Sequence, residues 1–374
     1  MTSDNSIYKK LAEHLSKLGM GYPVKDELID ILKEMFTEIE AEVALAIPTM
    51  VGPLRPAGMD DIRGRVNMPE DEVLAVLESL EKRGLLYSGK TEAGKKGYAL
   101  HQFGYGFPQI YFWKGEGAPE ARKMAKLTAK YFNREVIRNG FSTTTETKPS
   151  RYIPINGTIA TGKQAVYSHH MMGNVIDEAR VIALAHCGCR VVYKMMGRDC
   201  LHPAEVCMKF NDMAQYLIDH ELGREITKAE AHDVIRQSEE AGLVHFVDNA
   251  EGDIQHNCNC CGCACWNVGN IKRKKIPRDM LMATYFIRET DQEVCIGCGA
   301  CVERCPVEAV KMDGAFPDVD EAWCIGCGVC AKTCPSEAIK MVKRPDKPLD
   351  LPAKDFRALH GKILKEKGLE RRDP

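Results

Sequence analysis

The chain has 374 residues, enough for two or three domains with a sizeable buried core. Its 51 Lys and Arg nearly balance its 53 Asp and Glu, so net charge does not favour binding to nucleic acid or to an anionic membrane. The first residues lack the apolar segment of a signal peptide, and no run of about 18 apolar residues indicates a membrane span. These features predict a cytoplasmic protein.

Cysteine is the unusual residue of this sequence, with 17 copies that all lie between Cys187 and Cys334. Structural disulfides need an oxidising compartment and are typical of small secreted chains. A cytoplasmic chain this rich in cysteine is therefore expected to use its thiolates as metal ligands.

Residues 1–100 are predicted to form a helical domain that ends in a β-hairpin. One helix should open with a capping box, the reciprocal hydrogen bonding of Thr37 and Glu40. The longest helix should begin at Asn67 and end at Gly84, where the chain can turn left-handed. Two short strands follow, residues 85–87 and 97–100. This order resembles the winged helix-turn-helix domain of many bacterial and archaeal regulators.

The resemblance raises the question of DNA binding. The longest predicted helix, which would enter the major groove, begins Pro69-Glu70-Asp71-Glu72. Phosphate contacts supply much of the affinity for DNA, so a helix whose leading end is acidic is poorly suited to enter the major groove. We therefore do not expect a nucleic-acid partner. We expect this domain to dock a partner or to support a homo- or hetero-oligomer.

Residues 101–290 are predicted to form a Cys-rich mixed α/β domain. Strand-like runs at 181–185 and 243–247 alternate with helix-like runs at 204–220 and 228–241. The aromatic stretch 103–113 is expected to pack the seam between this domain and the first. An alternative is that it lines a docking or substrate-binding loop.

Nine cysteines of this middle domain form two groups, HCGCR with two later cysteines and HNCNCCGCACW. Together they are Cys187, Cys189, Cys200, Cys207, Cys258, Cys260, Cys261, Cys263 and Cys265. Their small and turn-forming spacers suit loops wrapped around a metal centre, and HCGCR follows a predicted buried strand. We expect one or two further 4Fe–4S clusters with ligands from both groups. A structural zinc site is a second interpretation, and buried spectator thiols are a third. His202, like His169 and His170, is more often a structural or surface residue than a ligand.

Residues 291–343 contain an internal repeat. CIGCGACVERCPVEAV from Cys295 aligns with CIGCGVCAKTCPSEAI from Cys324, and each copy has the spacing C-x2-C-x2-C-x3-C-P. Three cysteines on a tight glycine-bearing loop can face one cluster, while the fourth points to the other cluster. Two nested copies of this spacing are far more specific than one C-x2-C pair, and they argue against zinc here.

This module resembles bacterial-type dicluster ferredoxins. The resemblance implies two 4Fe–4S clusters. It assigns Cys295, Cys298, Cys301 and Cys334 to the first and Cys324, Cys327, Cys330 and Cys305 to the second. The remaining residues, 344–374, are predicted to be a basic arm with a helix near 353–367.

The sequence thus predicts a multidomain α+β protein with winged-helix-like, Cys-rich α/β and ferredoxin-like parts and a basic arm. We expect an iron–sulfur electron-transfer subunit of a cytosolic anaerobic oxidoreductase that relays single low-potential electrons to a redox partner. One alternative is a catalytic reductase whose active centre lies at the second Cys-rich site, although no catalytic residue can be named. Another is a redox-sensing transcriptional regulator. We expect the eight tail cysteines to hold the clusters that relay electrons, and any catalysis to belong to the nine upstream cysteines.

Overall fold

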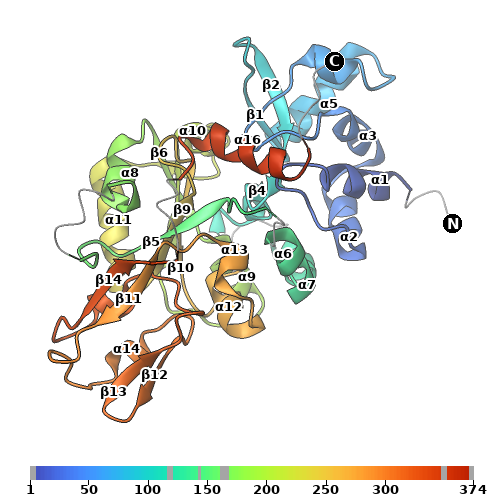
Figure 1. Cartoon of the computed structure of the whole chain (residues 1–374). Coiled ribbons are helices and arrows are strands. Elements are labelled where there is room, and N and C mark those ends of the chain that lie inside the picture. Colours follow the sequence, from blue (N-terminus) through green and yellow to red (C-terminus); the bar gives the residue numbers. More distant parts are fainter. Residues whose placement is uncertain (1–5, 116–120, 142–144, 161–167, 347–351, 370–374) are drawn as a thin grey trace.

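The computed structural model describes residues 6–115, 121–141, 145–160, 168–346 and 352–369 (Figure 1). Over these residues the chain is a mixed α/β protein, with an N-terminal helical part, a central sheet and a Cys-rich tail. None of the helices in these ranges has both the length and the apolar character needed to cross a membrane.

The N-terminal part is helical and ends in a hairpin. Its helices are α1 Ser6–Leu15, α2 Asp26–Met35, α3 Glu38–Ala46, α4 Met59–Arg63 and α5 Glu70–Lys82, and its strands are β1 Leu86–Lys90 and β2 Lys96–Leu100. The capping box at Thr37 and Glu40 is confirmed by both of its hydrogen bonds. The expected Asn67 cap is wrong, because Pro69 occupies the N-cap position and makes no side-chain cap. Proline fixes its own backbone angle and suits a helix start.

The first turn of α5 is acidic and exposed, as the sequence indicated. Its one basic residue, Lys82, lies in the last turn, and the hairpin lysine Lys96 forms an ion pair with Glu81. The likeness to a winged helix and the absence of a nucleic-acid partner both stay predictions.

The aromatic stretch joins the N-terminal part to the centre of the molecule. It forms β3 Gln102–Phe103, β4 Gly106–Phe107 and the 3-10 turn η1 Gln109–Tyr111. Phe103, Phe107, Phe112 and Trp113 are at most 1% exposed. Phe103 stacks on Phe132, and Phe132 stacks on Trp266 of the Cys-rich loop. The stretch therefore packs a seam, as expected, and fixes the position of the cysteine loop.

A six-stranded sheet forms the centre, with strand order β5-β9-β10-β7-β6-β8 and every neighbouring pair antiparallel. Its strands are β5 Ser150–Ile153, β6 Ile182–His186, β7 Glu205–Phe210, β8 Arg224–Glu225, β9 Val244–Asp248 and β10 His256–Cys260. The helices of this region are α6 Ala121–Tyr131, α7 Arg134–Phe141, α8 Met172–Glu178, α9 Gly188–Met195, α10 Asn211–Asp219, α11 Lys228–Glu240, α12 Val268–Lys274 and α13 Arg278–Leu281.

The prediction of one helix over 204–220 is wrong in its first half. Residues from Val206 to Phe210 are all buried, because β7 lies inside the sheet between β10 and β6. A strand covered on both faces has no alternation of apolar and polar residues, so its pattern resembles that of a buried helix. The helix begins only at Asn211.

A buried carboxylate ties this sheet to the aromatic seam. Asp248 is fully buried and accepts hydrogen bonds from the Tyr105 hydroxyl at 2.7 Å and from His256 Nδ1 at 2.7 Å. The backbone amides of Gln255 and His256 donate to its other oxygen. Burial alone would raise the pKa of Asp248, but His256 and these hydrogen bonds outweigh burial and lower the pKa to about 2.

We expect Asp248→Asn to lower the free energy of unfolding by about 3 kcal/mol at pH 7, because an amide cannot accept all four bonds or balance His256. The folded pKa lies below the unfolded value, so this stabilisation is fully present above about pH 4 and is lost as pH falls toward 2. Anaerobic urea unfolding at pH 7 measures it. Asp253→Asn is the control, since Asp253 is exposed and lies at a φ of 50° that asparagine tolerates. Equal midpoints for the two variants would contradict the expectation.

The tail holds two small two-stranded sheets and two one-turn helices, coloured orange to red in Figure 1. They are β11 Phe286–Thr290 with β14 Ile339–Lys343, β12 Val310–Asp313 with β13 Phe316–Val319, and the helices α14 Ala300–Glu303 and α15 Val329–Lys332. The strands after the two repeats, β12 and β14, thus belong to different sheets. The predicted arm helix is confirmed as α16 Phe356–Glu366, and Lys367 Nζ donates to the carbonyl of Gly19 at 2.6 Å.

Candidate metal centres

The tail cysteines surround two separate cavities. Cys295, Cys298, Cys301 and Cys334 line one cavity of about 310 Å³. Cys305, Cys324, Cys327 and Cys330 line the other, of about 340 Å³. The fourth cysteine of each repeat therefore lies with the first three of the other repeat. Each cavity has the four sulfurs that a 4Fe–4S cluster requires.

Glycines shape both loops. Gly326 has a φ of 64°, and a Cβ atom there would lie 2.2 Å from the carbonyl oxygen of Phe286. Gly328 caps α15 in the left-handed conformation at a φ of 77°. Any other residue at these positions would clash or be strained, so the glycines allow the cysteine loop to lie tightly against β11.

A buried arginine lies between the two cavities. Arg288 lines both of them and is 5% exposed. Its Nε donates to Thr290, whereas Nη1 and Nη2 have no hydrogen-bond partner in the described part of the chain. An unpartnered buried guanidinium is costly, and it fits a cavity that holds anionic clusters with sulfur acceptors. The residues around the two tail cavities therefore fit the 4Fe–4S clusters that the cysteine spacing indicates.

The two tail sets differ in their surroundings. Cys298 of the first set is exposed, and the neighbouring Ile296 is 67% exposed. Cys324 and Cys327 of the second set are buried against the middle part. There the Ile155 amide donates to the carbonyl of Cys327 at 3.0 Å. We call these the outer set and the inner set.

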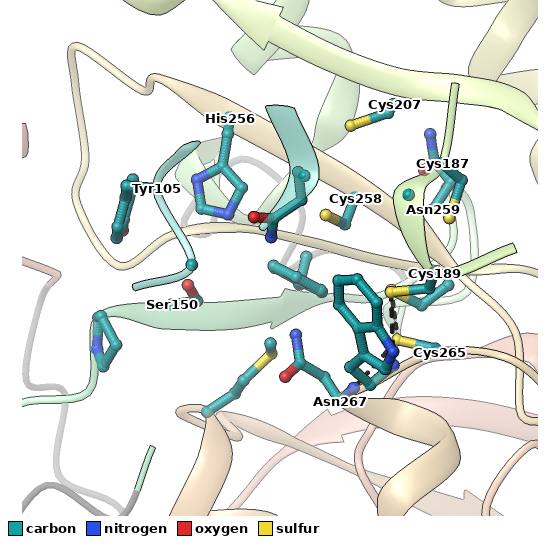
Figure 2. Close-up of a pocket in the computed structure, with 18 of the residues that line it drawn as sticks. Tyr105, Ser150, Cys187, Cys189, Cys207, His256, Cys258, Asn259, Cys265 and Asn267 are labelled. Atoms are coloured by element: carbon teal, nitrogen blue, oxygen red, sulfur yellow. Dashed lines mark hydrogen bonds between the residues drawn. The ribbon is translucent and has the colours of Figure 1, made fainter. Parts of the chain in front are cut away.

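The nine upstream cysteines divide into two places. Six of them line a single cavity of about 880 Å³ between the central sheet and the Cys-rich loop (Figure 2). They are Cys187, Cys189, Cys207, Cys258, Cys260 and Cys265. We call this the six-cysteine cavity. None of the six is exposed, so its sulfurs are shielded from bulk water.

Three elements bring these six sulfurs together. Cys187 caps α9 and Cys189 lies in its first turn. Cys207 lies on β7, while Cys258 and Cys260 lie on the neighbouring strand β10, on the same face because side chains alternate along a strand. Cys265 follows the turn after β10, and its sulfur lies 3.2 Å from that of Cys260.

Two buried cations accompany these thiols. The Lys209 side chain is 4% exposed, and the thiols of Cys207 and Cys258 outweigh its burial and raise its pKa. Hydrogen bonds from Cys207 and Cys260 lower the pKa of Cys258 well below its usual value. Arg190, 3% exposed, donates to the carbonyls of Pro203 and Asn259. The cavity thus balances thiolate charge, as a bound anionic cluster requires.

The side of the cavity opposite Cys189 and Cys265 is lined by polar side chains other than cysteine. Tyr105, Ser150 and His256 lie there, across the cavity from Cys189 and Cys265 (Figure 2). Tyr105 belongs to the aromatic stretch and His256 opens the second cysteine group, whereas the sequence does not single out Ser150 or Lys209. A lysine within the apolar run of β7 was the one available signal, because lysine is almost never fully buried without a partner.

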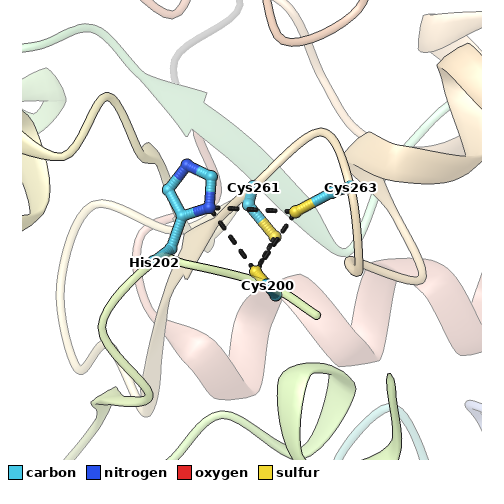
Figure 3. A group of neighbouring side chains, drawn as sticks. All are labelled: Cys200, His202, Cys261 and Cys263. Carbon is cyan, nitrogen blue, oxygen red and sulfur yellow. Dashed lines mark hydrogen bonds between the residues drawn. The ribbon is translucent and has the colours of Figure 1, made fainter. Parts of the chain in front are cut away.

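The other three cysteines form a compact group with a histidine (Figure 3). The Cys200 sulfur lies 3.2 Å from Cys263 Sγ, 3.8 Å from Cys261 Sγ and 3.5 Å from His202 Nδ1. All four ligand atoms lie within 4.8 Å of one another. This group could hold a metal ion or a further cluster. His202 is thus placed with metal-ligating residues, although its type alone favoured a structural role.

Other polar residues beside the two cysteine groups make structural contacts. His186 Nδ1 lies 3.2 Å from the carbonyl of Trp113. Of the basic run 272–275, Lys272 pairs with Glu308 at 2.7 Å, and Arg273 donates to backbone carbonyls of the Cys-rich loop. Lys274 Nζ donates to the Phe132 carbonyl. Three of the four basic side chains in this run therefore hold the loop and the tail in place.

Comparison with known proteins agrees with the tail geometry. Residues 288–341 match the family described as "4Fe-4S dicluster domain". A search of curated proteins found no match to the chain. The match covers both cysteine repeats, and with the Cys-rich groups it indicates iron–sulfur electron transfer.

Proposed function

We propose that this chain is the electron-transfer component of an anaerobic oxidoreductase, with a third 4Fe–4S cluster in the six-cysteine cavity. The outer and inner sets each supply four thiolates, and the cavity supplies six. Clusters bound there would accept and donate single electrons. The residues around the three sites would hold these groups, exclude water and balance their charge.

The observation that carries the proposal is the set of six cysteines that lines one cavity together with the buried Lys209. A buried tyrosine, Tyr152 on β5, relates this cavity to the inner set. Its side chain is 2% exposed, and its hydroxyl has no hydrogen-bond partner in the described part of the chain. Burial, together with the thiols of Cys265, Cys260 and Cys327, raises the pKa of Tyr152 well above its usual value. The thiols of both the six-cysteine cavity and the inner set therefore act electrostatically on this one buried side chain.

The outer set supports a protein partner. Four large apolar residues near it are at least 40% exposed, namely Val294, Ile296, Met312 and Phe316. The turn before Phe316 touches the first cysteine loop, since a Cβ on Gly297 would lie 2.5 Å from the Ala315 carbonyl oxygen. Exposed apolar groups beside an exposed cysteine favour a transient contact with a redox protein.

Iron analysis tests the proposal directly. Protein purified without oxygen is expected to contain about twelve iron atoms and twelve acid-labile sulfides per chain, from three four-iron clusters. About eight of each would contradict a cluster in the six-cysteine cavity and would agree with two clusters in the tail. Fewer than about eight would also contradict the tail assignment.

One observation favours a catalytic role as the second candidate. The six-cysteine cavity has more than twice the volume of either tail cavity, and Tyr105, Ser150 and His256 line its cysteine-free side. A small substrate could therefore bind beside a cluster. Cyanide added to the reduced protein separates the two functions, because it binds iron only where a protein ligand is missing. Six sulfurs suffice for full ligation, so we expect no spectral change, and a clear change would favour catalysis.

A further inference from the structure

We propose that Cys200, His202, Cys261 and Cys263 bind one zinc ion at a structural site separate from the iron–sulfur sites. Tetrahedral zinc, with Zn–S of about 2.3 Å and Zn–N of about 2.0 Å, places two sulfurs about 3.8 Å apart and a sulfur and a nitrogen about 3.6 Å apart. The Cys200–Cys261 sulfurs are 3.8 Å apart, and Cys200 Sγ lies 3.5 Å from His202 Nδ1. Two separations thus match a tetrahedral zinc site, the Cys200–Cys263 sulfurs are closer at 3.2 Å, and all four ligand atoms lie within 4.8 Å of one another.

The same distances argue against a four-iron cluster in this group. The cysteine sulfurs of such a cluster lie outside different corners of a cube, roughly 6 Å apart. Cys263 Sγ lies 3.2 Å from Cys200 Sγ and 3.8 Å from His202 Nδ1. Across the described ranges, no other three Cys, His, Asp or Glu ligand atoms come within 4.8 Å of one another. Cys260 and Cys265 of the six-cysteine cavity are also 3.2 Å apart, but among the described residues no third ligand atom lies within 4.8 Å of both, so only the group at Cys200 brings a full ligand set together.

The local backbone also suits a bound metal. Cys200 and His202 flank Leu201, whose side chain is 99% exposed. The turn therefore directs the two ligand groups inward and leaves an apolar side chain in solvent. The Ala264 amide donates to Cys261 Sγ at 3.3 Å, a bond that stabilises a thiolate. Three thiolates, one imidazole and a divalent cation carry a net charge of −1. Arg190 lies beside the group and donates to the carbonyl of Pro203.

The site joins two loops that connect elements lining the six-cysteine cavity. Cys200 and His202 lie between α9 and β7, and Cys261 and Cys263 lie in the turn after β10. Gly262 at the centre of this turn touches the tail, because a Cβ there would lie 2.4 Å from the Pro306 carbonyl oxygen. Zinc at this point would hold the cavity wall and the inner set in one arrangement. This role does not depend on what the cavity binds.

Two adjacent cysteines provide the test. Cys260 lines the six-cysteine cavity, whereas Cys261 belongs to the compact group. The full-length protein, purified without oxygen from medium with zinc and iron, is expected to contain one zinc per chain. Cys261→Ser should lose the zinc and keep its iron, while Cys260→Ser should keep the zinc. His202→Ala should lose zinc, and His202→Cys should retain it, because cysteine restores a fourth ligand.

Absorption spectroscopy at the zinc edge gives a readout that needs no variant. The wild-type protein should show three sulfurs at about 2.3 Å and one nitrogen at about 2.0 Å. Zinc absent from the wild type would overturn the proposal, as would zinc retained in Cys261→Ser or a shell of four sulfurs. Loss of four iron atoms from Cys261→Ser with no zinc in the parent would assign the group to a cluster instead.

Discussion

A variant with Cys258, Cys260 and Cys265 all replaced by Ser is expected to lose about four of its twelve iron atoms. Single replacements in the six-cysteine cavity are weaker tests, because six sulfurs exceed the four that one cluster needs. The triple variant leaves Cys187, Cys189 and Cys207, one sulfur too few. Its tail sets are untouched, so about eight iron atoms should remain and still accept electrons from dithionite.

The design separates a local loss from general unfolding. The zinc group shares the loop 258–265 but not the replaced sulfurs, so retained zinc would show that the loop still folds. The matched control is Cys298→Ser with Cys301→Ser, which should remove the same amount of iron from the exposed outer set. Twelve iron atoms in the triple variant would contradict a cluster in the cavity. Loss of all iron with the zinc retained would mean that the tail depends on the cavity.

The ferredoxin-like tail was predictable because its information is local. Each loop is set by glycines and cysteines within eleven residues, and a cluster that spans two such loops requires only that the repeats face one another. The arm helix and the capping box of α3 were predictable for the same reason, since caps and amphipathic spacing act over a few residues.

The division of the nine upstream cysteines could not be read from spacing. Cys260 ends β10 with its sulfur in the cavity, and Cys261 begins the turn that carries it to the zinc group. Adjacent residues reach different sites because the strand ends between them. Cys207 joins the cavity through the antiparallel pairing of β7 with β10, a contact between residues about fifty positions apart. The helix predicted over residues 204–220 includes Cys207, and a helical residue has no partner on a neighbouring strand.

The compact group did leave a signal in the sequence. Cys200-Leu-His202 and Cys261-Gly-Cys263 are two pairs of ligand residues with one-residue spacers, shorter than the two to four residues usual in zinc sites, so the signal is the paired residue types and not the spacing. That signal was hidden by the surrounding cysteines, which together suggested clusters. Arg288 left no such signal in the sequence, because its importance comes from its position between the two tail cavities.

Arg288→Met is expected to lower the reduction potentials of the tail by an amount on the order of 100 mV, because a buried unit charge acts at an effective dielectric constant of roughly 20. Reduction adds negative charge, and the guanidinium favours the more negative state. Its two free Nη groups also offer donors to cluster sulfurs, and such bonds raise the potential further. Methionine keeps most of the length of the side chain and removes both effects.

Redox titration followed by electron paramagnetic resonance measures the change, with iron analysis to verify that both clusters assemble. Arg288→Lys should restore part of the shift, because it keeps the charge but not the planar fork of donors. Lys340→Met is the matched control on the paired strand β14, where Lys340 is exposed and its charge is screened by solvent. Equal shifts in Arg288→Met and Lys340→Met would show that position between the cavities does not matter. A larger shift in Arg288→Met would identify one residue that tunes the outer and inner sets together.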